Sequence, residues 1–304
     1  MPTHVDQRLL VLRLRPSRRK ARDSALAETL ALVRGLGASA ARGGPLSELT
    51  GIAWVTVPGQ TLDAALSRLR TLGYVESVHL VTDRDEAHGA AVEVTRWRGR
   101  EVALVPLYHE PEQSFRERAP DRRKFLLECA DGVVRPITGY RGGSEALEHR
   151  ALPVVDARLL VNLAAREGER LLDPFAGAGA VIIAARERGI SAVSLDFDRA
   201  LRFGLREFAS CHVIGDARAL PFADRSFDAV ASEPPYHQSA LQTVLLSITE
   251  AARVVRLGGR IALLAAESQA SQIREAAARA RLMPELDSRI DRKGTWVQVF
   301  CWTR

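Results

Sequence analysis

The chain has 304 residues and a formal net charge of +6, and it is 46% hydrophobic and 26% charged, as ordinary globular proteins are. Its longest apolar runs are far shorter than the roughly 18 to 20 residues of a membrane span, and its first residues interleave arginine with leucine and valine, unlike a secretory signal. Three widely spaced cysteines suggest neither a disulfide framework nor a zinc site, so the sequence predicts a cytoplasmic protein with no membrane span and no metal.

The first part of the chain alternates short strands with helices. Period-two apolar runs predict strands over 8–15, 51–57 and 74–81, and helical spacing ended by glycine predicts helices over 24–37 and 61–73. Further short strands are expected over 101–108, 124–129 and 133–137. Because a glycine-rich stretch near 139–149 is typical of a boundary, we expect a smaller N-terminal α+β domain over residues 1–140.

The second part, residues 141–304, alternates strands and helices more regularly. Strands are predicted over 170–173, 192–196, 211–216, 227–233 and 260–266, and helices over 154–168, 179–189, 198–209, 239–259 and 270–283. Near-continuous apolar strands that alternate with helices are typical of an α/β fold with a mostly parallel sheet. Two closing strands near 286–290 and 295–303 complete seven strands, and as a hairpin they make the last strand antiparallel.

An acidic residue stands at the carboxyl end of each of the first four strands of this sheet. These residues are Asp173, Asp196, Asp216 and Glu233. Ligands of such sheets bind at the carboxyl ends of the strands, near the point where the strand order reverses. The series suits a nucleoside, because one acid can accept hydrogen bonds from the ribose hydroxyls and the next can face the amine of an adenine.

The loop DPFAGAGA after the first strand narrows the choice of nucleoside. Its glycines let a ligand approach the backbone, but it lacks the G-x-G-x-x-G pattern, and Asp173 would repel a pyrophosphate. An acid at this place suits the ammonium group of S-adenosylmethionine, so we predict that ligand as the cofactor. The predicted cofactor-binding residues are Asp173, Phe175, Ala176, Gly177, Gly179, Asp196, Phe197, Asp216 and Ala217.

The fourth strand ends in the sequence Glu233-Pro234-Pro235-Tyr236, which we predict to be catalytic. The lone pair of an exocyclic amine is delocalised into its base, so methyl transfer to it needs hydrogen-bond acceptors at the nitrogen. Glu233 and the carbonyl of Pro234 offer such acceptors, and prolines carry no competing N–H. Tyr236 offers a flat face for an extruded base.

Two segments concentrate positive charge, and phosphate groups of RNA are the partners that such clusters suit. The predicted RNA-binding residues are Arg13, Arg15, Arg18, Arg19, Lys20, Arg22, Arg116, Arg118, Arg122, Arg123 and Lys124. A solvated, arginine-rich surface explains the same charges equally well.

The motifs LLDPFAGAGAVIIAA, VSLDFD and EPPY resemble those of the class I S-adenosylmethionine-dependent methyltransferases, which have a Rossmann-like domain. More narrowly they are similar to the Trm11-like enzymes that make N2-methylguanosine in tRNA. The resemblance implies a tRNA or other structured RNA as substrate, and an RNA-binding, reduced THUMP-like N-terminal module.

Glu233 departs from the Asp or Asn of that family, which leaves several alternatives open. One is a DNA amino-methyltransferase, and another is a protein-glutamine methyltransferase. The third is a non-catalytic protein that binds RNA and cofactor without turnover because its acceptor is one methylene longer.

Overall fold

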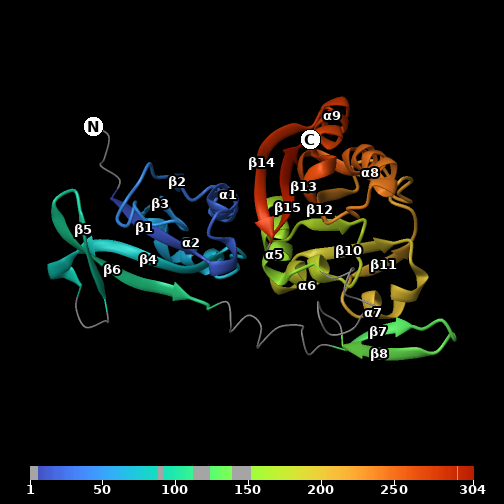
Figure 1. Cartoon of the computed structure of the whole chain (residues 1–304), viewed down its shortest axis with the longest axis horizontal. Coiled ribbons are helices and arrows are strands. Elements are labelled where there is room, and N and C mark those ends of the chain that lie inside the picture. Colours follow the sequence, from blue (N-terminus) through green and yellow to red (C-terminus); the bar gives the residue numbers. More distant parts are fainter. Residues whose placement is uncertain (1–5, 88–91, 112–123, 139–151, 293) are drawn as a thin grey trace. The chain divides into compact units, whose positions relative to one another are not determined.

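The computed structural model describes residues 6–87, 92–111, 124–138, 152–292 and 294–304. The chain forms two compact units, one of residues 1–115 with 291–293 and the other of residues 116–290 with 294–304. Each unit has its own sheet and its own helices (Figure 1).

The first unit has a six-stranded antiparallel sheet in the order β2-β3-β1-β4-β6-β5. Its strands are β1 (Gln7–Leu14), β2 (Ser39–Ala40), β3 (Ile52–Pro58), β4 (Val75–Asp83), β5 (Glu93–Trp97) and β6 (Arg100–His109). Helices α1 (Arg22–Leu32) and α2 (Leu62–Leu69) pack against each other and against β3. The first four strands and the two helices follow the βαββαβ order of ferredoxin-like units.

Strand β1 is central in this sheet, and both of its faces are covered. Leu10 and Leu12 point to one face and Val11 to the other, where it packs with Leu46 and Trp54. The predicted strands and helices of this unit are present. The sequence analysis missed β2, because two residues are too few to show apolar alternation. It also missed β5, an edge strand whose side chains are mostly exposed.

The second unit has a seven-stranded sheet in the order β11-β10-β9-β12-β13-β15-β14. Its strands are β9 (Arg170–Asp173), β10 (Ser191–Asp196), β11 (Cys211–Ile214), β12 (Phe227–Ser232), β13 (Val255–Ala266), β14 (Met283–Arg292) and β15 (Thr295–Thr303). The first five are parallel, and β15 is antiparallel to β13. The predicted, mostly parallel seven-stranded α/β sheet is therefore confirmed.

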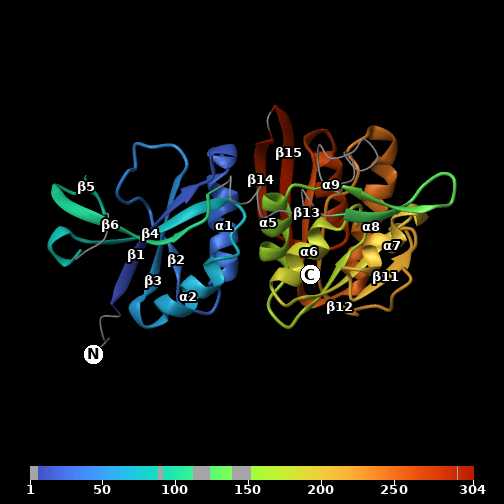
Figure 2. The ribbon, with the colours of Figure 1, turned by 90° about the horizontal axis from the view of Figure 1, so that it is seen from below.

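Helices cover this sheet. They are α5 (Val154–Ala164), α6 (Ala180–Glu187), α7 (Arg202–Arg206), α8 (Leu241–Val254) and α9 (Ala270–Arg279). Helices α5 and α6 pack side by side, as do α8 and α9 (Figure 2). The parallel strands between them are buried, with Leu172, Leu195 and Ile261 fully inaccessible, which explains their continuous apolar sequence.

The predicted helix over 239–259 is five residues too long, because α8 ends at Val254 and β13 begins at Val255. Val255 pairs with Phe227, and the register then shifts so that Ala229 pairs with Arg260. This irregularity takes up the residues between 255 and 260, which include Gly258 in the left-handed region at φ +75°. Apolar spacing alone does not reveal such an extension of a strand.

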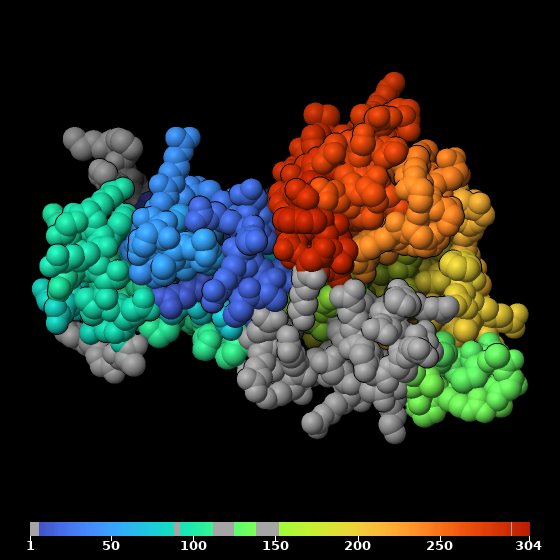
Figure 3. Space-filling view, viewed as in Figure 1, coloured from blue at the N-terminus to red at the C-terminus, as the bar shows by residue number. Residues whose placement is uncertain are grey.

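A separate hairpin of β7 (Lys124–Glu128) and β8 (Val134–Thr138) belongs to the second unit. The buried ring of Phe125 packs with Leu205 of α7 and fits against Gly204, where a Cβ would lie 2.4 Å from the ring. In the space-filling view the hairpin, in green, lies directly against the yellow atoms of this region (Figure 3). The structure thus divides the chain after residue 115, whereas we expected the division after residue 140.

Candidate functional site

A cavity of about 630 Å³ lies at the carboxyl ends of β9, β10 and β12. Most of the predicted cofactor-binding and catalytic residues line it. They are Asp173, Phe175, Ala176, Gly177, Asp196, Phe197, Asp216, Ala217, Glu233 and Pro235. Gly179, Pro234 and Tyr236 adjoin these residues along the chain without lining the cavity. Residues far apart in sequence meet here because the parallel strands all end at one edge of the sheet.

Asp173 ends β9, and its carboxylate is almost completely buried. Its Oδ1 accepts hydrogen bonds from the Ser232 hydroxyl at 2.5 Å and from the Phe175 N–H at 3.2 Å. Burial nevertheless raises the pKa of Asp173 to about 7, since the two hydrogen bonds only partly offset the desolvation, and the charges of Asp196 and Glu233 raise the pKa further. A cation placed here would restore the ionised form.

The loop between β9 and α6 brings its backbone to the cavity. Gly177 has φ +49°, and its N–H donates to Oδ2 of Asp196 at 2.8 Å. Gly179, at φ +79°, immediately precedes α6. Both conformations favour glycine, and Gly177 also lines the cavity.

Asp196 ends β10 and receives two backbone N–H groups. Its Oδ2 accepts from Gly177 and its Oδ1 from the N–H of Asp198 at 2.9 Å. Each carboxylate oxygen has two lone pairs, so Asp196 can accept from neighbouring hydroxyls as well as from the backbone. The next residue, Phe197, is 80% exposed beside the cavity, and its ring offers a stacking face.

Asp216 has a partner that the sequence analysis did not identify. The Arg218 guanidinium donates to both carboxylate oxygens, with Nε at 2.8 Å and Nη2 at 2.6 Å from Oδ2. This hydrogen-bonded pair lowers the pKa of Asp216, so the carboxylate stays ionised. Arg218 also lines the cavity. Its position two residues after Asp216 was the one feature of the sequence that could have predicted this ion pair.

Glu233 follows β12, and its Oε1 accepts a hydrogen bond from the Tyr236 hydroxyl. The three-residue spacing across two prolines brings the carboxylate and the phenol together. Beyond this loop the cavity wall continues with His237, Ser239 and Thr243, and Nδ1 of His237 lies 2.8 Å from the Ser239 hydroxyl. The sequence analysis assigned no role to these three residues.

The cavity fits S-adenosylmethionine chemically. Asp173 is a buried acid that suits an ammonium group, Asp196 has carboxylate oxygens that suit ribose hydroxyls, and the exposed Phe197 ring suits an adenine. Within the described residues no helix is long and apolar enough to span a membrane. Nor do those residues contain a cluster of three His, Cys, Asp or Glu side chains that would hold a metal.

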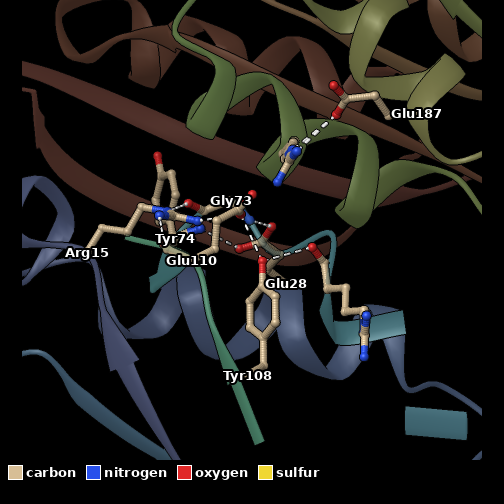
Figure 4. Close-up of polar contacts among 9 residues, drawn as sticks. Arg15, Glu28, Gly73, Tyr74, Tyr108, Glu110 and Glu187 are labelled. Atoms are coloured by element: carbon tan, nitrogen blue, oxygen red, sulfur yellow. Dashed lines mark hydrogen bonds and ion pairs between the residues drawn. The ribbon is translucent and has the colours of Figure 1, made fainter. Parts of the chain in front are cut away.

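The first basic segment does not form one exposed surface. Arg15 is fully buried and bonds the carbonyl oxygens of Gly73 and Glu110, at 2.7 and 2.6 Å, as well as the Glu110 carboxylate at 3.1 Å (Figure 4). Glu28 of α1 accepts from the N–H groups of Gly73 and Tyr74 in the same network. The prediction that Arg15 contacts RNA is therefore wrong, because its guanidinium is buried and already hydrogen-bonded to groups of the same unit.

Arg18 is also buried, with its guanidinium 5.3 Å from the Tyr74 ring centre, which corrects its predicted place on an RNA surface. Arg19, Lys20 and Arg22 reach the surface, although Arg22 also lies over the Trp54 ring. Arg13 is half-buried and forms an ion pair with Glu93. The second predicted segment, Arg116, Arg118, Arg122 and Arg123 with the side chain of Lys124, lies outside the described residues.

Comparison with known proteins identifies the domain that carries the cavity. Residues 172–263 match a family model described as a methyltransferase domain. A demethylmenaquinone methyltransferase of Beutenbergia cavernae is 39% identical over 101 residues, which are 33% of this chain and 41% of that protein. A tRNA (guanine(10)-N2)-dimethyltransferase of Methanothermobacter thermautotrophicus is 38% identical over 92 residues, which are 28% of this chain and 27% of that protein. The chain thus spans less than half the length of these curated relatives.

Among solved structures, TrmN from Thermus thermophilus aligns with a TM-score of 0.50 and 18% identity, covering 98% of this chain and 99% of that one. At this identity the likeness is one of fold, and it includes both units. The match to a methyltransferase domain confirms the predicted resemblance to class I S-adenosylmethionine-dependent methyltransferases, and a tRNA guanine-N2-dimethyltransferase is among the proteins that this domain resembles. S-adenosylmethionine is the cofactor of such a domain.

Replacing Arg15 tests its structural role. Arg15→Leu removes a buried donor from two carbonyl oxygens and from the Glu110 carboxylate, so the free energy of unfolding of the first unit should fall by about 3–5 kcal/mol. Urea denaturation followed by tryptophan fluorescence measures this change. The matched control, Arg19→Leu at an exposed position, should change it by less than about 0.5 kcal/mol. Equal effects of the two changes would contradict the assignment.

The raised pKa of Asp173 predicts how cofactor affinity depends on pH. Below about pH 7 the carboxyl is protonated and offers no charge to an ammonium group, so S-adenosylmethionine should bind more weakly at pH 6 than at pH 8. Asp173→Asn should bind weakly at both values. Calorimetry of both proteins separates this effect from titration of the ligand, which is the same in each. A wild-type affinity whose pH dependence equals that of the variant would refute the prediction.

Proposed function

We propose that the protein methylates an exocyclic amine of a base in RNA, with guanine N2 of tRNA as the first substrate to test. One observation carries the proposal. Glu233 and Pro235 of the Glu233-Pro-Pro-Tyr loop line the same cavity as Asp173 and Asp196, so an acceptor group bound at Glu233 would lie next to the cofactor site.

The loop has the chemistry that an amine acceptor needs. When bound, S-adenosylmethionine supplies an electrophilic methyl group. An attacking amine would form a new N–C bond as the bond between the methyl group and the sulfonium breaks, and the neutral thioether would leave with that electron pair. The amine must also lose a proton, and the Glu233 carboxylate is placed to accept that proton or a hydrogen bond from the amine. The carbonyl of Pro234 can accept a second hydrogen bond, which would hold the nitrogen lone pair out of the plane of the base.

Tyr236 compensates for the length of Glu233. A glutamate side chain has one more rotatable bond than aspartate, and its carboxylate would otherwise sample several positions. The hydroxyl of Tyr236 binds Oε1 and restricts that freedom. The same bond fixes the phenol ring beside Glu233, and a base that reaches Glu233 could stack on it.

The acceptor side of the cavity favours a polar substrate. Glu233, His237, Ser239 and Thr243 stand there beside Pro235 and Ala240, and they offer hydrogen bonds that a base can use. A quinone, such as the name demethylmenaquinone methyltransferase implies, has fewer polar groups to bind them. RNA is supported by the relative named as a tRNA guanine-N2-dimethyltransferase and by the exposed cations of the first unit. No described feature specifically favours DNA or a protein glutamine.

The first test is transfer of a labelled methyl group to tRNA, duplex DNA and protein in parallel. We expect tRNA to be labelled, and nuclease digestion to place the label on an exocyclic amine. Glu233→Ala should lower kcat by about 10²-fold, the effect of removing one preorganised hydrogen bond to the transition state. Glu233→Gln keeps an acceptor oxygen and should lose less.

The control is the affinity for S-adenosylmethionine, which should be unchanged in both Glu233 variants. Labelling of DNA or protein but not tRNA would contradict the RNA assignment. If wild type is inactive and Glu233→Asp is active, the protein is a binder of cofactor and RNA rather than an enzyme.

Binding of tRNA should weaken steeply with salt, because cations that contact phosphates release counterions. Replacing Arg19, Lys20 and Arg22 by Ala should reduce the slope of log Kd against log salt by about 1 for each of these cations that binds a phosphate. Filter binding between low and moderate salt measures the slope. Asp23→Ala, which removes an exposed charge of opposite sign nearby, should not reduce it. An unchanged slope in the triple variant would remove these cations from the interface.

A further inference from the structure

The loop that carries Glu233 and Tyr236 is held from behind by a residue outside every predicted motif. Gln269 belongs to a short 3-10 helix (Glu267–Gln269) between β13 and α9, and its side chain is fully buried. Its Nε2 donates to the carbonyl oxygen of Pro235 at 3.3 Å and to that of His237 at 3.4 Å. The two held carbonyls bracket Tyr236 on both sides.

The chemistry of this contact defines the orientation of the amide. Both partners are carbonyl oxygens, which only accept, so the NH₂ group of Gln269 and not its oxygen must face the loop. The other end of the amide has no such support. Within the described residues, Oε1 of Gln269 is buried without a hydrogen-bond partner.

This arrangement is not what stability alone would select. A buried amide oxygen without a partner costs free energy. Gln269 also occupies the N-cap position of α9, yet its side chain makes no capping hydrogen bond. Ser, Asp or Asn would serve a helix start better, because their short side chains reach the N–H groups of the first turn.

We propose that Gln269 is a positioning residue that holds the backbone of Pro235 to His237, so that Tyr236 binds Glu233 and keeps its carboxylate facing the acceptor. The inference rests on the proposed function for its catalytic consequence. Ser232, bound to Asp173, anchors the start of the same loop, and Gln269 anchors its end. A hydrogen-bond acceptor that acts in the transition state needs rigid support at both ends of its loop, because small displacements of the acceptor lower the rate of the reaction.

Two variants test the role of Gln269. Gln269→Met keeps the volume and removes both hydrogen bonds, while Gln269→Glu presents a carboxyl to the two carbonyls. Gln272→Met is the matched control, since Gln272 lies on α9 and makes no hydrogen bond to the loop among the described residues. The measurements are hydrogen–deuterium exchange of the peptide covering 233–240, affinity for S-adenosylmethionine, and kcat with KM on the RNA substrate.

We expect amide exchange in the loop to rise about tenfold or more in Gln269→Met, with cofactor affinity unchanged. On the RNA substrate kcat should fall about tenfold or more with little change in KM, and the control should match wild type. In Gln269→Glu the carboxyl donates only while protonated, so its kcat relative to wild type should fall as pH rises.

Unchanged loop exchange in Gln269→Met would overturn the proposal, as would faster exchange with wild-type kcat. If wild type methylates no RNA, the proposed function fails, and the exchange rates still decide whether Gln269 holds the loop. A Gln269→Glu to wild-type activity ratio that does not vary with pH would also count against hydrogen-bond donation as the mechanism.

Discussion

The buried carboxylate of Asp173 is the constraint on which the site depends. It stands at the end of the interior strand β9, next to the point where the strand order reverses, and it is removed from water there. A charge in this position is costly unless a partner compensates for it. The hydroxyl of Ser232 and the N–H of Phe175 offset part of the cost of desolvating the carboxylate. A bound cation would offset the rest, so the position favours a positively charged group.

The same carboxylate also links the two halves of the site, at the ends of the neighbouring strands β9 and β12. Its hydrogen bond to Ser232 joins the end of β9 to the end of β12, and Glu233 is the next residue. The backbone pairing of β9 and β12 fixes their register, and this side-chain bond adds a contact where the two strands end and their loops begin. Methyl transfer requires donor and acceptor in line within a narrow distance, so under the proposed function this contact would serve catalysis as well as structure.

The alternation of strands and helices was sufficient to predict the fold of the second unit and the meeting of Asp173, Asp196 and Glu233. Parallel topology brings strand ends together, so their position in sequence was enough. Contacts made by side chains from elsewhere could not be predicted in this way. Gln269 reaches its loop from 34 residues away, and its sequence context, a polar residue before a helix, is indistinguishable from an ordinary surface position.

Charge clustering was the least reliable guide, for a physical reason. A guanidinium can satisfy buried carbonyls and carboxylates through five donors, so an arginine in a basic run is as able to fill an interior network as to meet a phosphate. Arg15 directly follows the central strand β1, and the carbonyls of the neighbouring segments converge on it. Arg19 and Lys20 follow the short helix after β1, where the chain returns to the surface. Whether a cation of this segment is buried in the unit or exposed to a partner thus depends on where the strand ends, and not on how many charges lie nearby in the sequence.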